Sequence, residues 1–261
     1  MNNFDSKINY AKFYEQSESW GKDLDEIQKE RALVTQSFVP EDVDTILDIG
    51  CGDGRITNEL SLKYNITSMD INYEALKYVN KSKIIASIEQ IPFHNNSFDL
   101  VLSTEVIEHL PDHLFRRAII DIERVSKRYI VISVPYKENL YASMTRCNIC
   151  GKVFHEYMHF QSFTRKRLES IFPSFRIIQS FIFGPREKYD NNFLLFIVRR
   201  IGRKWLTSQM ALCPWCGSKD LGNNQGNLIS RIAEYLNWRI CHRLSFHKRW
   251  IIVLYERVSS K

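Results

Sequence analysis

The stretch Ile46-Leu-Asp-Ile-Gly-Cys-Gly-Asp-Gly54 decides the fold of this chain. A short apolar run is followed by an acid and then by glycines at alternate positions, Gly50, Gly52 and Gly54. Glycine has no Cβ, so such a segment turns sharply and lets a ligand approach the backbone closely. Residues 56–62 then indicate the beginning of a helix. We therefore predict a strand, a glycine turn and a helix, which together bind nucleotide-like ligands at the end of a parallel sheet.

The spacing of the glycines argues against a dinucleotide. The dinucleotide fingerprint has a third glycine five residues after the first, and Arg55 occupies that position. Asp48 and the glycines after it instead resemble the first motif of the class I S-adenosylmethionine (SAM)-dependent methyltransferases. SAM has no phosphate and carries a cationic sulfonium, so a carboxylate beside the turn is compatible with it.

A second acid follows at the spacing of a ribose ligand. Residues 65–70 predict a second strand that ends in Asp70. Asp70 lies 20 residues after Gly50, the distance at which nucleotide-binding βαβ units place a carboxylate on ribose hydroxyls. We predict that Asp70 binds the ribose.

Two further strands complete the resemblance. Residues 83–93 predict a third strand and a turn with the "Pro-Phe" motif, and residues 96–103 predict a fourth strand with "Ser-Phe-Asp". The segment Thr104-Glu-Val-Ile-Glu-His-Leu110 follows the fourth strand. Residues 41–135 thus carry four motifs that resemble the class I methyltransferase pattern in order.

The resemblance implies an α/β fold with a seven-stranded, mostly parallel, doubly wound sheet of the Rossmann-like methyltransferase type. Its last strand is expected to run antiparallel, between the fifth and the sixth. The implied cofactor is SAM, and its implied binding residues are Asp48, Gly50, Cys51, Gly52, Asp70, Ile71, Ser87, Ile88 and Thr104. Many relatives have an aspartate at the position of Ser87, where it accepts a hydrogen bond from adenine. A serine hydroxyl is a weaker acceptor than a carboxylate.

The predicted elements divide the chain into four segments. Residues 1–40 form an N-terminal helical cap and residues 41–183 form the SAM-binding core. Residues 184–248 form a basic insertion, and residues 249–261 form the final strand of the core sheet. Helical spacing of apolar residues predicts that the cap is helical over residues 4–39. Its aromatic residues are predicted either to stack on the cofactor or to pack a helix on the sheet: Tyr10, Phe13, Tyr14 and Trp20.

Basic charge is concentrated in the C-terminal third. The chain has a net charge of +6, whereas residues 180–261 contain 14 Lys/Arg and 5 Asp/Glu, a net +9. This region is either a solvated surface or a contact for an anionic partner, namely a phosphorylated or lipid-linked substrate, a nucleic acid or a membrane. Residues 193–205, apolar and then basic, predict either a packed helix with a basic edge or an amphipathic helix on a membrane.

The sequence contains no apolar run long enough to span a bilayer and no signal-peptide pattern. We therefore expect a cytoplasmic protein, with peripheral membrane contact as an alternative.

Four of the six cysteines form two matched pairs, Cys147-Asn-Ile-Cys150-Gly and Cys213-Pro-Trp-Cys216-Gly. A two-residue gap lets both thiolates bind one metal, and two such pairs suit a tetrahedral zinc site. We predict a structural Zn²⁺ that joins two insertions as a lid over the substrate, with a redox dithiol as the alternative. Cys51 and Cys241 are expected to be small packing residues.

Candidates for the chemistry follow the fourth strand. A hydroxyl acceptor must lose a proton during methyl transfer, and His109 is the best predicted base. Glu105 and Glu108 would share a helix face with His109. His155 and His159, next to the first cysteine pair, are the other candidates.

The same residues leave a metal alternative open. Glu-x-x-Glu-His with a distant histidine resembles the metal site of small-RNA 2′-O-methyltransferases, and the set here would be Glu105, Glu108, His109 and either His155 or His159. Otherwise Glu108 and His109 orient a short helix before Pro111.

The sequence thus predicts SAM-dependent O- or N-methylation of a small-molecule or sugar- or lipid-linked acceptor in a biosynthetic pathway. One alternative is an RNA methyltransferase whose basic third contacts phosphates. The other is a non-catalytic zinc-bearing binding protein.

Overall fold

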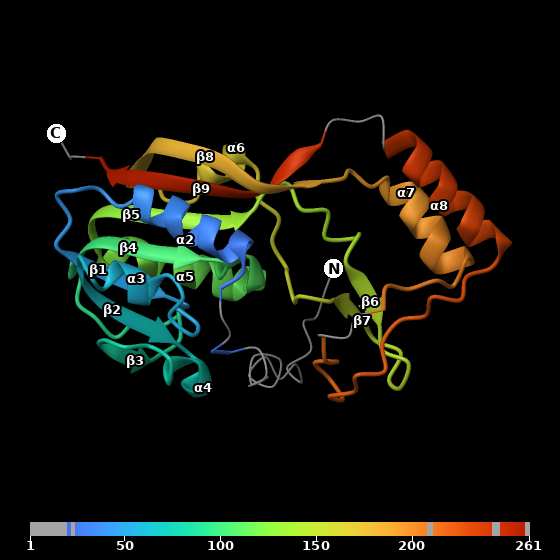
Figure 1. The fold of residues 1–261 in the computed structure, drawn as a ribbon, viewed down its shortest axis with the longest axis horizontal. Helices are drawn as coiled ribbons and strands as arrows, with labels where there is room; N and C mark the ends of the chain where they lie inside the picture. The colour runs from blue at the N-terminus through green and yellow to red at the C-terminus, as the bar shows by residue number, and fades with distance from the viewer. Residues whose placement is uncertain (1–19, 22–23, 208–210, 242–245, 259–261) are drawn as a thin grey trace. The chain divides into compact units, whose positions relative to one another are not determined.

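The computed structural model describes residues 20–21, 24–207, 211–241 and 246–258 (Figure 1). The chain divides into two compact units. The core unit comprises the described residues within Gln16–Lys137, Phe163–Pro185 and Lys248–Lys261. The insertion unit comprises the described residues within Glu138–Ser162 and Arg186–His247.

The core unit is built on a seven-stranded sheet with the order β3-β2-β1-β4-β5-β9-β8. Its strands are β1 (Thr45–Ile49), β2 (Asn65–Asp70), β3 (Lys83–Ile85), β4 (Phe98–Thr104), β5 (Ser126–Pro135), β8 (Phe175–Glu187) and β9 (His247–Arg257). The pairs β1–β2, β2–β3, β1–β4 and β4–β5 are parallel, whereas β9 is antiparallel to β5. The predicted mostly parallel sheet, with its last strand antiparallel and next to the fifth, is confirmed.

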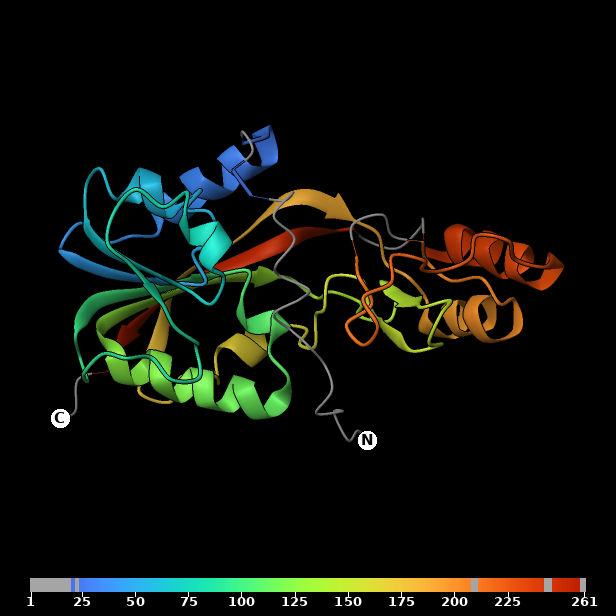
Figure 2. The ribbon, with the colours of Figure 1, turned by 90° about the horizontal axis from the view of Figure 1, so that it is seen from below.

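Helices cover both faces of this sheet (Figure 2). They are α2 (Glu26–Ser37), α3 (Thr57–Leu60), α4 (Tyr73–Leu76), α5 (Asp112–Val125) and α6 (Arg165–Leu168). Side-chain caps fix where several of them begin, because a cap satisfies an N–H group that the first turn leaves open. Asp25 caps α2, Asn72 caps α4 and Thr164 caps α6.

The N-terminal helix is shorter than predicted. Among the described residues of the predicted helix over 4–39, only Glu26–Ser37 is helical. Gly21 has a φ of +73° and Asp25 is an extended N-cap, so the chain before Glu26 cannot continue the helix. Residues 4–19, with Tyr10, Phe13 and Tyr14, lie outside the described residues.

Alternate residues of the central strands fill two apolar layers. On the face covered by α5, the core includes Leu47, Val101 and Ile130. On the face next to α2 and α3, it includes Ile46 and Leu100. Successive side chains of a strand point to opposite faces, so a sheet buried on both sides needs near-continuous apolar strands.

The insertion unit contains a hairpin and a helical pair. The hairpin is formed by β6 (Met144–Arg146) and β7 (Val153–His155). The helical pair consists of α7 (Asn192–Phe196), which continues as the π-helical segment η3 (Ile197–Ile201), and of α8 (Leu228–Cys241). The helix predicted within residues 193–205 therefore ends at Ile201. Among the helices that the structure describes, none has the length and apolar character needed to cross a membrane.

Gly184 in β8 provides a test of the core packing. It has a φ of +85°, and a Cβ at this position would lie 2.3 Å from the Trp250 ring. We expect Gly184→Ala to lower the free energy of unfolding by about 1–3 kcal/mol, because backbone strain and displacement of the indole add. Guanidinium chloride unfolding followed by circular dichroism measures this effect. Ile178→Ala, at a 46% exposed position of the same strand, is the control and should change stability by less than about 0.5 kcal/mol. An equal effect of both variants would contradict the argument.

Candidate active site

The carboxyl ends of β1 and β4 mark the point where the strand order reverses. From β1 the chain continues to β2 and β3 on one side, and then crosses to β4 on the other side. Open α/β sheets bind ligands outside the carboxyl ends of their strands at such a point. The glycine turn follows β1 and Thr104 ends β4, so the predicted cofactor segments meet there.

The glycine turn has a backbone that only glycine adopts easily. The φ angles of Gly50, Gly52 and Gly54 are 71°, 55° and 79°, in the left-handed region. A Cβ on Gly50 would lie 2.3 Å from a methyl carbon of Val106. The segment after β4 therefore packs directly on the turn. The N–H of Gly50 also donates to the carbonyl of Met69 in β2, at 2.7 Å.

Asp70 joins the end of β2 to the glycine turn. Its carboxylate accepts from the N–H of Gly52 at 2.8 Å and from the N–H of Asn72 at 2.8 Å. Burial raises the pKa of Asp70, and these N–H groups act in the opposite direction. Ser87 and Ile88 follow β3, which pairs with β2. The residues predicted for ribose and adenine thus follow neighbouring strands.

Asp48 is a buried acid within β1. Its side chain accepts a hydrogen bond from the hydroxyl of Thr57 in α3. Burial raises the pKa of Asp48 to about 7, the Thr57 hydrogen bond lowers it and the charge of Asp70 raises it further. A cation bound nearby would favour the ionised form. Burial, together with the neighbouring carboxylates, also raises the pKa of the Cys51 thiol, which stays protonated at neutral pH.

The residue pair Trp20-Gly21 lies against the glycine turn. The N–H of Gly21 donates to the carboxylate of Asp53 at 3.0 Å, and Arg55 also donates to this carboxylate. The Trp20 ring is 3.3 Å from the position of a Cβ on Gly52. Asp53 was not a predicted site residue, although an acid inside the turn and a basic residue two positions later were signals in the sequence.

The prediction that Glu105, Glu108 and His109 share one face of a helix after β4 is wrong. Glu105 has a φ of +57°, and only a 3₁₀ turn, η2 (Ile107–His109), follows it. A helix begins only at α5, after Pro111, because proline fits the beginning of a helix and disrupts its interior. Glu105, Glu108 and His109 therefore do not share a helix face.

Instead, the Glu105 side chain is engaged apart from those of Glu108 and His109. Glu105 accepts from the indole N–H of Trp250 in β9 at 2.8 Å. Glu108 is fully buried, with its carboxylate 3.8 Å from Nε2 of His109. Glu105 is thus fixed against the last strand, while Glu108 and His109 stay together.

The other two candidate histidines belong to the insertion unit, where they share a carboxylate. Glu138 lies 2.6 Å from Nδ1 of His159 and 3.4 Å from Nε2 of His155. The two imidazole rings stack, with centroids 4.8 Å apart. Burial acts to raise the pKa of Glu138, but the two histidines lower it to about 2. Glu138 was not a predicted site residue, although the three side chains have the composition and spacing of a metal-binding group.

The four paired cysteines converge within the insertion unit. Their sulfur atoms all lie within 4.8 Å of one another. The Sγ distances Cys147–Cys216 and Cys150–Cys213 are both 3.5 Å, much longer than a disulfide bond of about 2 Å. Tetrahedral zinc with Zn–S bonds of about 2.3 Å requires sulfur atoms about 3.8 Å apart. The cluster therefore fits zinc.

The two cysteine turns have the same backbone design. Gly151 donates its N–H to the carbonyl of Cys147 at 3.0 Å, and Gly217 donates to Cys213 at 2.8 Å. Both glycines have a positive φ, 71° and 73°. Burial acts to raise the pKa of Cys147, but N–H groups of the turn, first that of Cys150, lower it to about 7. In the second turn burial raises the pKa of Cys213 to about 12, although N–H groups of the turn act to lower it.

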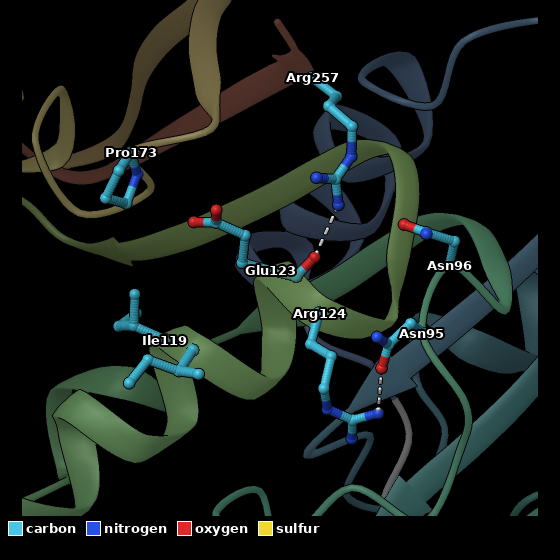
Figure 3. Close-up of a pocket in the computed structure, with 8 residues that line it drawn as sticks. Asn95, Asn96, Ile119, Glu123, Arg124, Pro173 and Arg257 are labelled. Carbon is cyan, nitrogen blue, oxygen red and sulfur yellow. Dashed lines mark hydrogen bonds between the residues drawn. The ribbon is translucent and has the colours of Figure 1, made fainter. Parts of the chain in front are cut away.

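A pocket of about 390 Å³ lies elsewhere in the core unit (Figure 3). Asn95 and Asn96 precede β4, and Glu123 and Arg124 end α5, so the pocket lies at the amino ends of the parallel strands. Its arginines are engaged: Arg124 donates to Asn95 at 3.3 Å, and Arg257 donates to the carbonyl of Glu123 at 2.8 Å. The pocket is thus separate from the cofactor segments.

Residues 47–130, from β1 into β5, match the family model described as a methyltransferase domain. This part of the core unit is a methyltransferase domain. The match includes the glycine turn, Asp70 and the segment after β4, and it confirms the family predicted from the four motifs.

Relatives of this methyltransferase domain share only part of the chain. An uncharacterized protein of Methanocaldococcus jannaschii is 30% identical over 141 residues, which cover 52% of this chain and 60% of that protein. A ubiquinone biosynthesis O-methyltransferase of Hydrogenovibrio crunogenus is 27% identical over 123 residues, 43% of this chain and 50% of that enzyme. The chain thus spans about half the length of these curated relatives.

A solved structure shows the same fold. A SAM-dependent methyltransferase from Archaeoglobus fulgidus superposes with a TM-score of 0.53, covering 88% of this chain and 94% of that one, at 16% identity. At this identity the similarity supports the fold.

The buried Asp48 gives the methyltransferase domain a testable pH dependence. Its pKa is raised from 3.8 to about 7, so between these values the folded state binds a proton that the unfolded state does not. Stability therefore falls as pH rises through this window. We expect Asp48→Asn, which still accepts from Thr57, to raise the melting temperature at pH 8 by about 5 °C and to change it little at pH 4.

Scanning fluorimetry at both pH values measures this difference. Asp44→Asn, at an exposed position next to β1, is the matched control and should show no pH-dependent gain. A lower melting temperature of Asp48→Asn at pH 8 would contradict the assignment of a destabilising buried charge.

Proposed function

We propose that this protein transfers the methyl group of SAM to a small-molecule or sugar- or lipid-linked acceptor, as an O- or N-methyltransferase. The observation that carries the proposal is the Asp70 carboxylate on the N–H of Gly52 at the switch point of the sheet. A carboxylate there suits ribose hydroxyls, and the buried Asp48 nearby suits a cationic ligand.

The chain offers a separate group for each part of the cofactor. In the proposal Gly50 and Gly52 hold the methionine part through their backbone, together with Asp48 and Cys51. Asp70 and Ile71 hold the ribose, Ser87 and Ile88 face the adenine, and Thr104 lies near the methyl group. Bound SAM supplies an electrophilic methyl group on a sulfonium. The remaining task of the protein is to align the acceptor with this methyl group.

We assign proton removal from a hydroxyl acceptor to His109. The buried Glu108 next to it supports this role, since a carboxylate orients an imidazole and stabilises its protonated form. Glu105, held by Trp250, is then a positioning residue for the segment after β4. The same contact weakens the RNA alternative, because it engages Glu105, one member of the predicted metal set of Glu105, Glu108, His109 and either His155 or His159. His155, in the cluster with Glu138, remains a second base candidate.

We propose that one structural Zn²⁺ binds Cys147, Cys150, Cys213 and Cys216. Four thiolates leave no open coordination position, so the ion would support the fold of the insertion unit. The apolar cluster around these cysteines is small; its other buried members are Phe154, Met158, Ala211 and Leu221. A metal adds stability where a core is this limited. The insertion leaves the sheet just after the carboxyl end of β5, which supports a role in acceptor binding.

Transfer of labelled methyl from SAM to a fractionated cell extract tests the function. We expect label in the small-molecule or lipid fraction. Asp70→Ala should weaken SAM binding about 10- to 100-fold by calorimetry, because it removes charge-assisted hydrogen bonds, and should abolish the labelling. Asp44→Ala is the exposed control. Label in nuclease-sensitive material would replace this proposal by the RNA alternative, and absence of SAM binding to the native protein would favour a non-catalytic role.

The zinc proposal has its own test. Native protein should contain about one zinc per chain by mass spectrometry of the metal content, and Cys147→Ser with Cys213→Ser should lose it, since two thiolates cannot complete the site. We expect the double variant to bind SAM normally and to lose acceptor turnover. Cys241→Ser, in α8 outside the cluster, should keep its zinc. Equal zinc content in the native protein and the double variant would disprove the site.

A further inference from the structure

The helical pair of the insertion unit has an unusual distribution of side chains. Along α8 the buried residues are small: Ser230, Ala233 and Cys241. They lie along one side of the helix, and α8 packs against α7 and η3 (Figures 1 and 2). A Cβ on Gly202, just after η3, would lie 2.4 Å from the Cβ of Ser230. The contact between the helices is therefore close and uses small side chains.

Most large apolar residues of the pair are exposed to solvent. The exposed ones in α8 are 41–70% exposed: Leu228, Ile229, Ile232, Tyr235, Leu236, Trp238 and Ile240. The exposed ones in α7 and η3 are Phe193, Phe196 and Ile201, which are 45–69% exposed. We call these ten residues the outer face of the helical pair. A surface helix of a globular protein normally buries its large apolar residues and exposes its polar ones. A large exposed apolar patch therefore marks an interaction site.

Positive charge accompanies the outer face. Arg200, Arg203, Arg231 and Arg239 are exposed on the same helices or directly after η3. Within the part of the chain that the structure describes, none of these four forms an ion pair with an acidic side chain. In contrast, Lys204 is paired with Glu234 at 2.7 Å. The arginines are thus available for an external anion.

This combination fits the surface of an anionic bilayer. Interfacial helices place apolar and aromatic residues at the acyl boundary and arginines at the headgroups, and tryptophan and tyrosine favour this boundary. The α8 helix has 14 residues and is about 21 Å long. It is thus shorter than the hydrocarbon core of about 30 Å, and would lie in the plane of the membrane.

We propose that the outer face of the helical pair docks this protein on an anionic phospholipid surface. A second copy of the chain is a poorer occupant, because a symmetric contact would bring the same unpaired arginines together. A nucleic acid would use the arginines but leave the apolar residues in water. The inference goes beyond the proposed methyl transfer and does not depend on it.

Flotation of the full-length, zinc-loaded protein with lipid vesicles tests the proposal, in the absence of SAM. We expect binding to vesicles that contain about 30% phosphatidylglycerol in phosphatidylcholine at low ionic strength, where screening is weak. Binding should fall about tenfold or more when the salt is raised to about 0.5 M. Vesicles of phosphatidylcholine alone should bind much less.

Two variants separate the apolar contribution to vesicle binding from the electrostatic contribution. Leu228→Glu with Ile232→Glu should lower the partition coefficient more than about tenfold, because it places charge in the apolar boundary. Arg231→Gln with Arg239→Gln should lower it about fivefold per arginine on anionic vesicles. Leu62→Glu, at an 82% exposed position of the core unit, is the matched control and should bind like the native protein. Circular dichroism and zinc content verify that each variant is folded.

Two results would overturn the membrane-docking proposal. No binding to anionic vesicles at low salt would overturn it, and so would binding that the Leu228→Glu, Ile232→Glu variant retains. A concentration-dependent dimer that this variant abolishes, without vesicle binding by the native protein, would assign the outer face to a second copy instead. Because SAM is absent from the assay, neither result bears on methyl transfer.

Discussion

The hydrogen bond from the N–H of Gly52 to the carboxylate of Asp70 is the constraint on which the candidate site depends. It ties the turn after β1 to the end of β2, in a turn whose three glycines adopt positive φ angles. With the turn in this shape, Val106 packs on Gly50 from the segment after β4. The segments predicted to surround the cofactor are therefore fixed relative to one another by the backbone.

The sheet and the cofactor segments were predictable because their signals are local. A strand, a glycine turn and an acid at the end of the next strand occur in order along the sequence, and parallel pairing places them at one edge. The shape of the segment after β4 was not predictable in this way. Glu105 takes a left-handed conformation and contacts Trp250, 145 residues later, and no helical periodicity encodes a contact at that distance.

In the insertion unit, too, features encoded by local sequence motifs were predictable, whereas contacts between residues distant in sequence were not. The two Cys-x-x-Cys-Gly motifs predicted turns that could share a metal, and the structure brings their sulfur atoms together. Glu138, which contacts His155 and His159, was missed because it lies after β5, at a distance in sequence from both. The exposure of large apolar residues and the burial of small ones on α8 were also not predictable, since apolar periodicity alone does not tell which side of a helix is covered.

The position of β9 has a consequence for the synthesis of the chain. This strand fills the place between β5 and β8, and it is reached only after the whole insertion unit. Until the ribosome has released residues 247–257, the edges of β5 and β8 have unpaired N–H and C=O groups, which are sites for aggregation. The indole that holds Glu105 arrives with the same strand. The amino-terminal part of the chain is therefore made first but acquires its final site geometry last, and a truncated product would lack both.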